Sequence, residues 1–162
     1  MSSSPADPAR TYRGEGLLMD SNLLLLLLVG LHDPARIEKF KRTAQFTIGD
    51  FKLLVDYIEQ FKGVVTTPSI LTEVSNLLGQ LPENLRHYFW QHFACNLKNL
   101  HEHYTPSQEL GSEKAFPRFG LTDMAVLKEA SRKYRVLTHD FRLTQYLLSQ
   151  NVDVINFNHL RT

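Results

Sequence analysis

Short apolar runs alternate with longer stretches of helical periodicity along this chain, and this alternation limits the folds open to it. Residues 16–19, 64–66, 136–138 and 152–157 are short and apolar enough to be predicted as strands. Strands that alternate with helices pair in parallel, because each helix carries the chain back across one face of the sheet. The sequence therefore predicts a three-layer α/β/α fold with a central parallel sheet.

The segments between these strands have the periodicity of helices. The Leu-rich run from Leu23 to Val29 is predicted as a buried core helix, because it is far shorter than the roughly 20 residues of a membrane span. Asp50 is expected to cap a helix that runs to residue 61, and Thr122 to cap one that runs to residue 134. Further helices are expected over 68–78, 85–100 and 143–148, with a surface insertion over 32–49 and a loop-rich connection over 104–119.

The composition is that of a single globular domain. Of the 162 residues, 43% are hydrophobic and 22% are charged, and Lys plus Arg number 18 against 17 for Asp plus Glu. A formal net charge of +1 excludes a strongly basic or acidic chain, so any nucleic-acid contact is expected from a local patch. The single Cys95 excludes an internal disulfide and indicates a cytoplasmic location. We expect one domain over 16–162 behind a disordered tail over 1–15.

Acidic residues lie where such a sheet places its ligand site. Asp20 follows the first predicted strand directly, and Asp140 follows the third with only His139 between. Asp123 lies in the first turn of the helix that leads into that third strand, and Glu73 lies at the edge of the apolar stripe of an earlier helix. Because ligands of parallel α/β sheets bind outside the carboxyl ends of the strands, we expect these carboxylates to converge there.

Four converging carboxylates favour a bound cation. Like charges at one site raise one another's pKa values unless a cation neutralises them. Oxygen ligands without Cys or a His cluster indicate Mg²⁺ or Mn²⁺ as the cofactor. Such a metal activates water and stabilises the charged oxygens of a phosphodiester during hydrolysis.

Four segments of the chain resemble the successive acidic motifs of the PIN-domain nucleases. They occur in the same order, and together they extend over nearly the whole chain from residue 16 to residue 157. The segments are Leu17-Leu18-Met19-Asp20-Ser21-Asn22, Thr67-Pro68-Ser69-Ile70-Leu71-Thr72-Glu73-Val74, Leu121-Thr122-Asp123 with Leu127, and Val136-Leu137-Thr138-His139-Asp140.

This resemblance implies a three-layer fold and a metal-dependent endoribonuclease. Asp20, Glu73, Asp123 and Asp140 would be the catalytic and metal-binding acids, and Asn22 and Thr138 would orient them or a water molecule. A small PIN protein also resembles the VapC-type toxins of bacterial toxin-antitoxin pairs. That likeness implies a homodimer with an antitoxin peptide as its partner, besides the RNA substrate.

Several basic residues are candidates for contact with the RNA backbone. His139 adjoins the predicted site, and Arg118 and Arg142 lie near it in the sequence. A second group, formed by Arg36, Lys39, Lys41 and Arg42, lies in the predicted insertion. Cationic side chains of this kind bind phosphates through salt-sensitive contacts, although such groups also occur on ordinary solvated faces.

Other functions are compatible with parts of this pattern. A phosphatase with an aspartyl intermediate would use Asp20, but Asn22 replaces the second acid of its Asp-x-Asp motif. A receiver-like signalling module would need a Lys after a late strand, where the chain has Asn158-His159-Leu160-Arg161. Each acid alone also has an ordinary role as a helix cap or a turn residue. A non-catalytic PIN-like module that binds RNA or protein, and an RNA-processing or defence nuclease outside a toxin-antitoxin pair, remain the alternatives.

Overall fold

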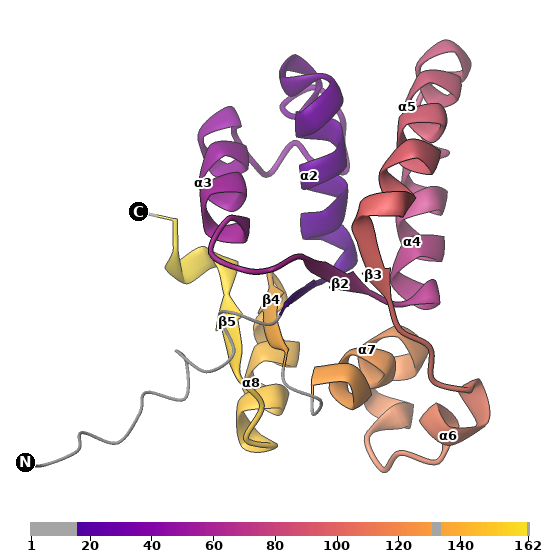
Figure 1. Ribbon diagram of the computed structural model, residues 1–162, viewed down its shortest axis with the longest axis vertical. Helices are drawn as coiled ribbons and strands as arrows, with labels where there is room; N and C mark the ends of the chain where they lie inside the picture. The colour runs from indigo at the N-terminus through magenta and orange to yellow at the C-terminus, as the bar shows by residue number, and fades with distance from the viewer. Residues whose placement is uncertain (1–15, 131–133, 162) are drawn as a thin grey trace, which may run out of the picture.

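Five parallel strands form the centre of the protein, as the sequence predicts. The computed structural model describes residues 16–130 and 134–161, and the predicted tail over 1–15 lies outside the described residues (Figure 1). The strands pair in the order β3-β2-β1-β4-β5, with every pair parallel. They are β1 (Leu17–Met19), β2 (Val64–Thr66), β3 (Leu100–Glu102), β4 (Arg135–Thr138) and β5 (Val154–Asn156).

Helices lie on both sides of this sheet. Figure 1 shows α2 to α5 on one side and α6 to α8 on the other, which confirms the three layers. The helices are α2 (Ser21–His32), α3 (Ile48–Ile58), α4 (Pro68–Leu78), α5 (Glu83–Asn96), α6 (Ser107–Gly111), α7 (Phe116–Ala130) and α8 (Phe141–Ser149). Three short 3-10 turns complete the described elements, namely η1 (Pro34–Arg36), η2 (Leu97–Asn99) and η3 (Phe157–His159).

The Leu-rich helix α2 lies in the core. All of its side chains from Leu23 to Val29 are buried, because α3, α4 and α5 pack around a helix that follows the central strand. A helix that is apolar on every side needs such complete burial. Within the described ranges, no helix combines the length and the apolar character that a membrane crossing requires.

The direction of the connections changes between β1 and β4. The chain leaves β1 through α2 towards β2, whereas it leaves β4 through α8 towards β5 on the opposite side. Figure 1 shows α2 and α8 on different faces of the sheet. A crevice opens at the carboxyl ends of two such neighbouring strands, because the chain turns away from it on both sides. Asp20 and Asp140 follow these two strands.

The segment over 32–49 is more buried than a surface insertion would be. Ile37, Phe40 and Phe46 are at most 6% exposed and belong to the main core. The capping residue of α3 is Thr47, whose hydroxyl accepts the Asp50 N–H at 3.1 Å while the Asp50 carboxylate accepts the Thr47 N–H at 2.8 Å. The prediction that Asp50 caps this helix is therefore wrong, because Asp50 occupies the third helical position of a capping box.

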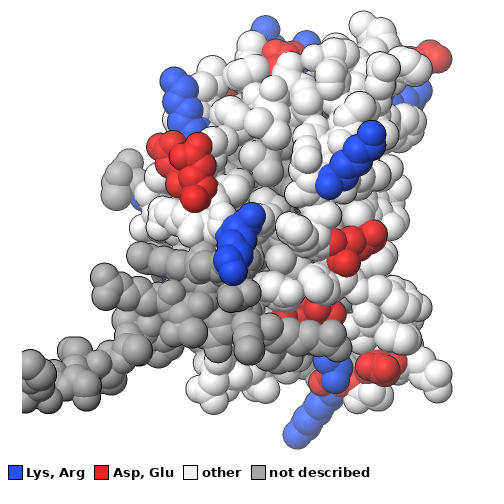
Figure 2. All heavy atoms as spheres, viewed as in Figure 1, with Lys and Arg blue, Asp and Glu red and all other residues white. Residues whose placement is uncertain are grey.

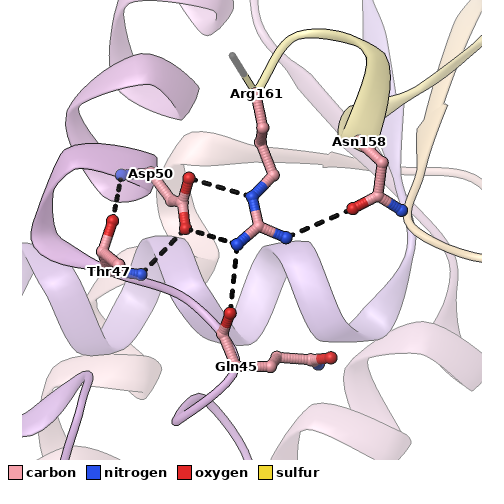
Figure 3. Close-up of polar contacts among 5 residues, drawn as sticks. All are labelled: Gln45, Thr47, Asp50, Asn158 and Arg161. Atoms are coloured by element: carbon pink, nitrogen blue, oxygen red, sulfur yellow. Dashed lines mark hydrogen bonds and ion pairs between the residues drawn. The ribbon is translucent and has the colours of Figure 1, made fainter.

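Arg161 ties this segment to the C-terminal end of the chain (Figure 3). Its guanidinium donates to both carboxylate oxygens of Asp50, at 3.0 and 2.9 Å. It also donates to the Gln45 carbonyl at 3.1 Å and to Asn158 Oδ1 at 3.2 Å. The same guanidinium lies 5.5 Å from the ring centre of Phe46. A single side chain thus links the start of α3 to the residues after β5.

The region between α5 and β4 differs most from its prediction. The expected helix over 85–100 ends at Asn96, and the edge strand β3 follows within four residues. The expected loop over 104–119 contains α6 and the start of α7. Gly120 interrupts α7 with φ 84° and ψ −174°, in a region that favours glycine. The helix expected to reach residue 134 is described as far as Ala130, residues 131–133 lie outside the described part, and Tyr134 is not helical.

The Arg161 contacts predict a measurable contribution to stability. Arg161→Ala is expected to lower the free energy of unfolding by about 1 to 2 kcal/mol, because it leaves the mostly buried Asp50 carboxylate without its cation. Urea denaturation followed by circular dichroism measures this change. Lys41→Ala, at an exposed position of the same segment, is the matched control and should change the value by less than about 0.5 kcal/mol. Equal values for the two variants would contradict the assigned role of Arg161.

Candidate functional site

A pocket of about 160 Å³ lies at the carboxyl ends of β1 and β4, and all four predicted acids line it. Asp20 follows β1 and Asp140 lies just beyond β4, while α4 and α7 contribute Glu73 and Asp123. The structure therefore brings together four carboxylates from four separate segments. The remaining lining consists of Ser21, Asn22, Thr122 and Thr138 with the apolar Ile70, Val126 and Leu143.

Asp20 is the most firmly held of these acids. Its Oδ1 accepts the Leu23 N–H at 2.9 Å, so Asp20 caps α2. Its Oδ2 accepts the Thr138 hydroxyl and the His139 N–H, both at 2.7 Å. Burial raises the pKa of Asp20, and the hydrogen bonds from His139, Leu23 and Thr138 oppose that rise. Asp20 therefore has both roles: it caps α2 and it lines the pocket.

Thr138 connects Asp20 to Asp140. The fully buried Thr138 hydroxyl donates to Asp20 Oδ2 and accepts the Asp140 N–H at 3.0 Å. Asp140 in turn caps α8, since its Oδ1 accepts the Leu143 N–H at 3.0 Å. These contacts link the segments that carry both acids, and the orienting role of Thr138 stays a prediction. Asn22, the other predicted supporting residue, lines the pocket with an exposed side chain.

Glu73 is anchored by two hydroxyl groups that were not predicted from the sequence as residues of the site. Ser21 donates to Glu73 Oε2, and Thr122 donates to Oε1 at 2.7 Å. The prediction that Thr122 caps the following helix is not met, because Thr122 lies within α7 as described and its hydroxyl holds Glu73. Both hydroxyl residues adjoin a predicted acid in the sequence, Ser21 after Asp20 and Thr122 before Asp123, and this adjacency was the available signal.

Asp123 experiences the charge of all the other acids. It accepts no hydrogen bond from any residue in the described part of the chain and is only partly exposed. The pKa of Asp123 is raised to about 6. Burial is the largest cause, the repulsion of Asp140, Glu73 and Asp20 adds to it, and Arg142 opposes it. The other three carboxylates and the Arg142 guanidinium therefore lie within electrostatic range of Asp123.

The predicted basic residues divide into two groups. Arg142 lies within electrostatic range of Asp123, and its Nη2 donates to the Arg118 carbonyl at 3.4 Å. His139 is partly buried against the ring of Phe46, with its backbone N–H on Asp20. None of the predicted arginines and lysines lines the pocket itself, and Arg36, Lys39, Lys41 and Arg42 follow the far end of α2. There Arg36 pairs with Asp33 at 3.5 Å, and Arg42 donates to Gln80 at 2.6 Å.

The donor set of the pocket fits a hard divalent cation. Every polar side chain that lines it presents oxygen, apart from the amide nitrogen of Asn22. In the parts of the chain that the structure describes, no three His, Cys, Asp or Glu side chains lie close enough together to enclose a metal ion. Mg²⁺ does not require such an enclosure, because it usually keeps several waters and takes one or two carboxylates directly.

The comparisons with known proteins leave the site to be interpreted from its own residues. No model of a known protein family matches the chain, and the search of curated proteins finds no match.

The raised pKa of Asp123 predicts a pH dependence in metal-free protein. The folded state binds this proton more tightly than the unfolded state, so ionisation of Asp123 destabilises the fold as the pH rises from about 4 through about 6. In EDTA, Asp123→Asn should therefore match the wild type near pH 4 and exceed its stability at pH 7 by about 2 kcal/mol, because solvent screening of the partly exposed carboxylate reduces the full value of the shift. Thermal melts across this range measure the difference, with the exposed Asp56→Asn as control. A constant difference between wild type and Asp123→Asn at all pH values would contradict the prediction.

Proposed function

We propose that this protein is a metal-dependent endoribonuclease that hydrolyses RNA phosphodiester bonds, similar to the PIN-domain nucleases. The observation that supports the proposal is the convergence of Asp20, Glu73, Asp123 and Asp140 on one pocket at the switch point of the sheet. Folding places four like charges together there and raises the pKa of Asp123. A site that only needed helix caps would not require two further carboxylates from α4 and α7.

The four acids offer different oxygens to a cation. Asp123 has both carboxylate oxygens available, and Asp140 uses only Oδ1 as a helix cap. Asp20 has its Oδ2 occupied by two donors and its Oδ1 by one. Asp123 and Asp140 would therefore hold Mg²⁺ or Mn²⁺ together with water molecules, beside the fixed charge of Asp20. When bound, the metal lowers the pKa of a water molecule and offsets negative charge on the phosphate oxygens.

The side chains around the pocket orient the acidic groups and transfer a proton. Thr138 and the His139 N–H hold Asp20 in one orientation, and Ser21 with Thr122 holds Glu73 across the pocket. Glu73 is exposed and lies opposite the β-strand ends, where it accepts a proton from the attacking water. Arg142 near the pocket mouth provides a positive charge for the phosphate of the substrate. The pocket thus combines a carboxylate cluster for the cation with a guanidinium for the anion.

Cleavage of a defined RNA pool tests this function. The purified full chain is incubated with structured and single-stranded RNA in Mg²⁺, Mn²⁺ or EDTA, and the products are resolved on a denaturing gel. We expect cleavage with either metal and none in EDTA. Asp20→Asn and Asp123→Asn should each lower the rate at least about 100-fold, because loss of an outer-shell partner costs up to about 100-fold and loss of a direct ligand costs at least as much. Asp56→Asn, an exposed acid on α3, should retain the wild-type rate.

The same assay distinguishes the non-catalytic alternative. If the wild type and the two variants behave alike under all three conditions, the four acids do not form a hydrolytic site. A PIN-like module that binds RNA or protein without cleaving it would then be the better description. Circular dichroism of each variant establishes that a loss of rate is not a loss of fold.

A further inference from the structure

A separate pocket of about 200 Å³ lies along the edge strand β3 and shares no lining residue with the pocket of the four acids. We call it the β3 pocket. The described residues that line it are Lys62, Val65, His101, His103 and Tyr134. Four of these side chains carry hydrogen-bond donors, and among the described lining residues there is no carboxylate. A lining of this kind suits an anion, in contrast to the acidic pocket, which suits a cation.

The local sequence places three rings on the β3 pocket. His101 lies in β3 and His103 follows that strand, and residues two positions apart in an extended chain point to the same face. Gly63 leaves space for the His101 ring, because a Cβ at Gly63 would lie 2.8 Å from both Cδ2 and Nε2. Gly16 does the same for Tyr134, since a Cβ there would lie 3.1 Å from the ring carbon Cδ1. The rings therefore occupy space that larger residues would fill.

A buried carboxylate lies behind His103. Glu129 of α7 is 1% exposed, and its Oε1 accepts the Thr105 hydroxyl at 3.0 Å. Its Oε2 accepts no hydrogen bond from any residue that the structure describes, and His103 Nδ1 lies 3.9 Å from it. A buried carboxylate oxygen without a partner is unfavourable. Protonated His103 would supply the partner that this oxygen lacks.

The other ring nitrogen of His103 determines where the Tyr134 hydroxyl points. His103 Nε2 lies 2.9 Å from the Tyr134 hydroxyl oxygen. A protonated imidazole donates with both nitrogens, so Nδ1–H would face Glu129 and Nε2–H would face the Tyr134 oxygen. The Tyr134 hydroxyl would then donate its own hydrogen to a different acceptor. An anion in the β3 pocket would accept that hydrogen bond and stabilise the charge on His103.

We propose that the β3 pocket binds a phosphate dianion, either as inorganic phosphate or as the phosphate group of a monoester. The Tyr134 hydroxyl, a ring N–H of His101 and the Lys62 ammonium donate to it from three separate segments. A tetrahedral phosphate accepts hydrogen bonds from several directions, whereas a carboxylate presents its oxygens on one side. This binding needs no metal and does not depend on the proposed nuclease function.

The overall charge of the protein does not favour anions in general. The face of the molecule in Figure 2 has Lys and Arg interspersed with Asp and Glu, and the net charge is only +1. Attraction of a phosphate must therefore come from the local donors of the β3 pocket and not from a broad positive field. For this reason, loss of one donor should weaken binding measurably.

Nuclear magnetic resonance of the full chain with ¹⁵N-labelled histidine tests the proposal. Inorganic phosphate is titrated near neutral pH in EDTA, which prevents binding through a metal at the acidic pocket. We expect saturable shifts of the ring nitrogens of His101 and His103, and no saturable shift with chloride at the same ionic strength. In the bound state the two ring nitrogens of His103 should have the similar shifts of a protonated imidazole. A nucleoside 5′-monophosphate, titrated in the same way, distinguishes a monoester from the free ion as the ligand.

Conservative variants identify the donors. Tyr134→Phe should weaken phosphate binding roughly 10-fold, as expected for loss of one hydrogen bond to a charged group. Tyr104→Phe is its matched control, because Tyr104 is 70% exposed and does not line the β3 pocket. His103→Gln should weaken binding at least as much, whereas His87→Gln, at an exposed position of α5, should retain the parent affinity.

The outcomes separate this inference from the nuclease proposal. The absence of a saturable histidine shift with both phosphate and the monoester would overturn it, even if the wild type cleaves RNA. Equal phosphate affinity of Tyr134→Phe and Tyr104→Phe would also overturn it. Saturable binding that Tyr134→Phe weakens would support the β3 pocket, even in a chain that cleaves nothing. Melting temperatures close to that of the parent protein establish that the Phe variants are folded.

Discussion

The hydrogen bonds of the Asp20 carboxylate connect the fold to the site. This side chain lies at the end of the central strand, caps the core helix α2, and accepts two donors from the residues after β4. The two neighbouring strands therefore end in register, and their loops open the crevice between α2 and α8. Burial raises the pKa of Asp20, and these donors stabilise its charged form. The other acids are arranged around this fixed charge, and burial together with their repulsion raises the pKa of Asp123.

Local chemistry explains what could be predicted from the sequence. The strands at Leu17–Met19 and Val64–Thr66 are short apolar runs with a clear end, and Pro68 marks the first turn of a helix. Because an alternation of strands and helices leads to a parallel sheet, the three layers followed from the order of the elements. The convergence of the acids followed from the same geometry, since parallel strands expose their carboxyl ends at one edge.

Tertiary contacts determine what could not be predicted. The edge strand β3 reads Leu-His-Glu and is largely exposed, so it lacks the apolar signal of a buried strand. The segment around Phe46 is polar in sequence but becomes ordered through Arg161, a residue more than a hundred positions away. Ser21 and Thr122 hold Glu73 across the pocket, and no periodicity marks such a long-range contact. The positive φ of Gly120 likewise lies where the sequence predicted only a loop before a capped helix.

The claim that the acidic pocket binds a divalent cation can be tested directly by diffraction. Crystals grown with Mn²⁺ above pH 7, where Asp123 is ionised, would be measured for anomalous scattering near the manganese edge. The proposed site predicts an anomalous peak inside the pocket, within coordination distance of Asp123 and at least one of Asp20 and Asp140. A well-ordered pocket without such a peak in saturating Mn²⁺ would contradict the assignment of these carboxylates as metal ligands.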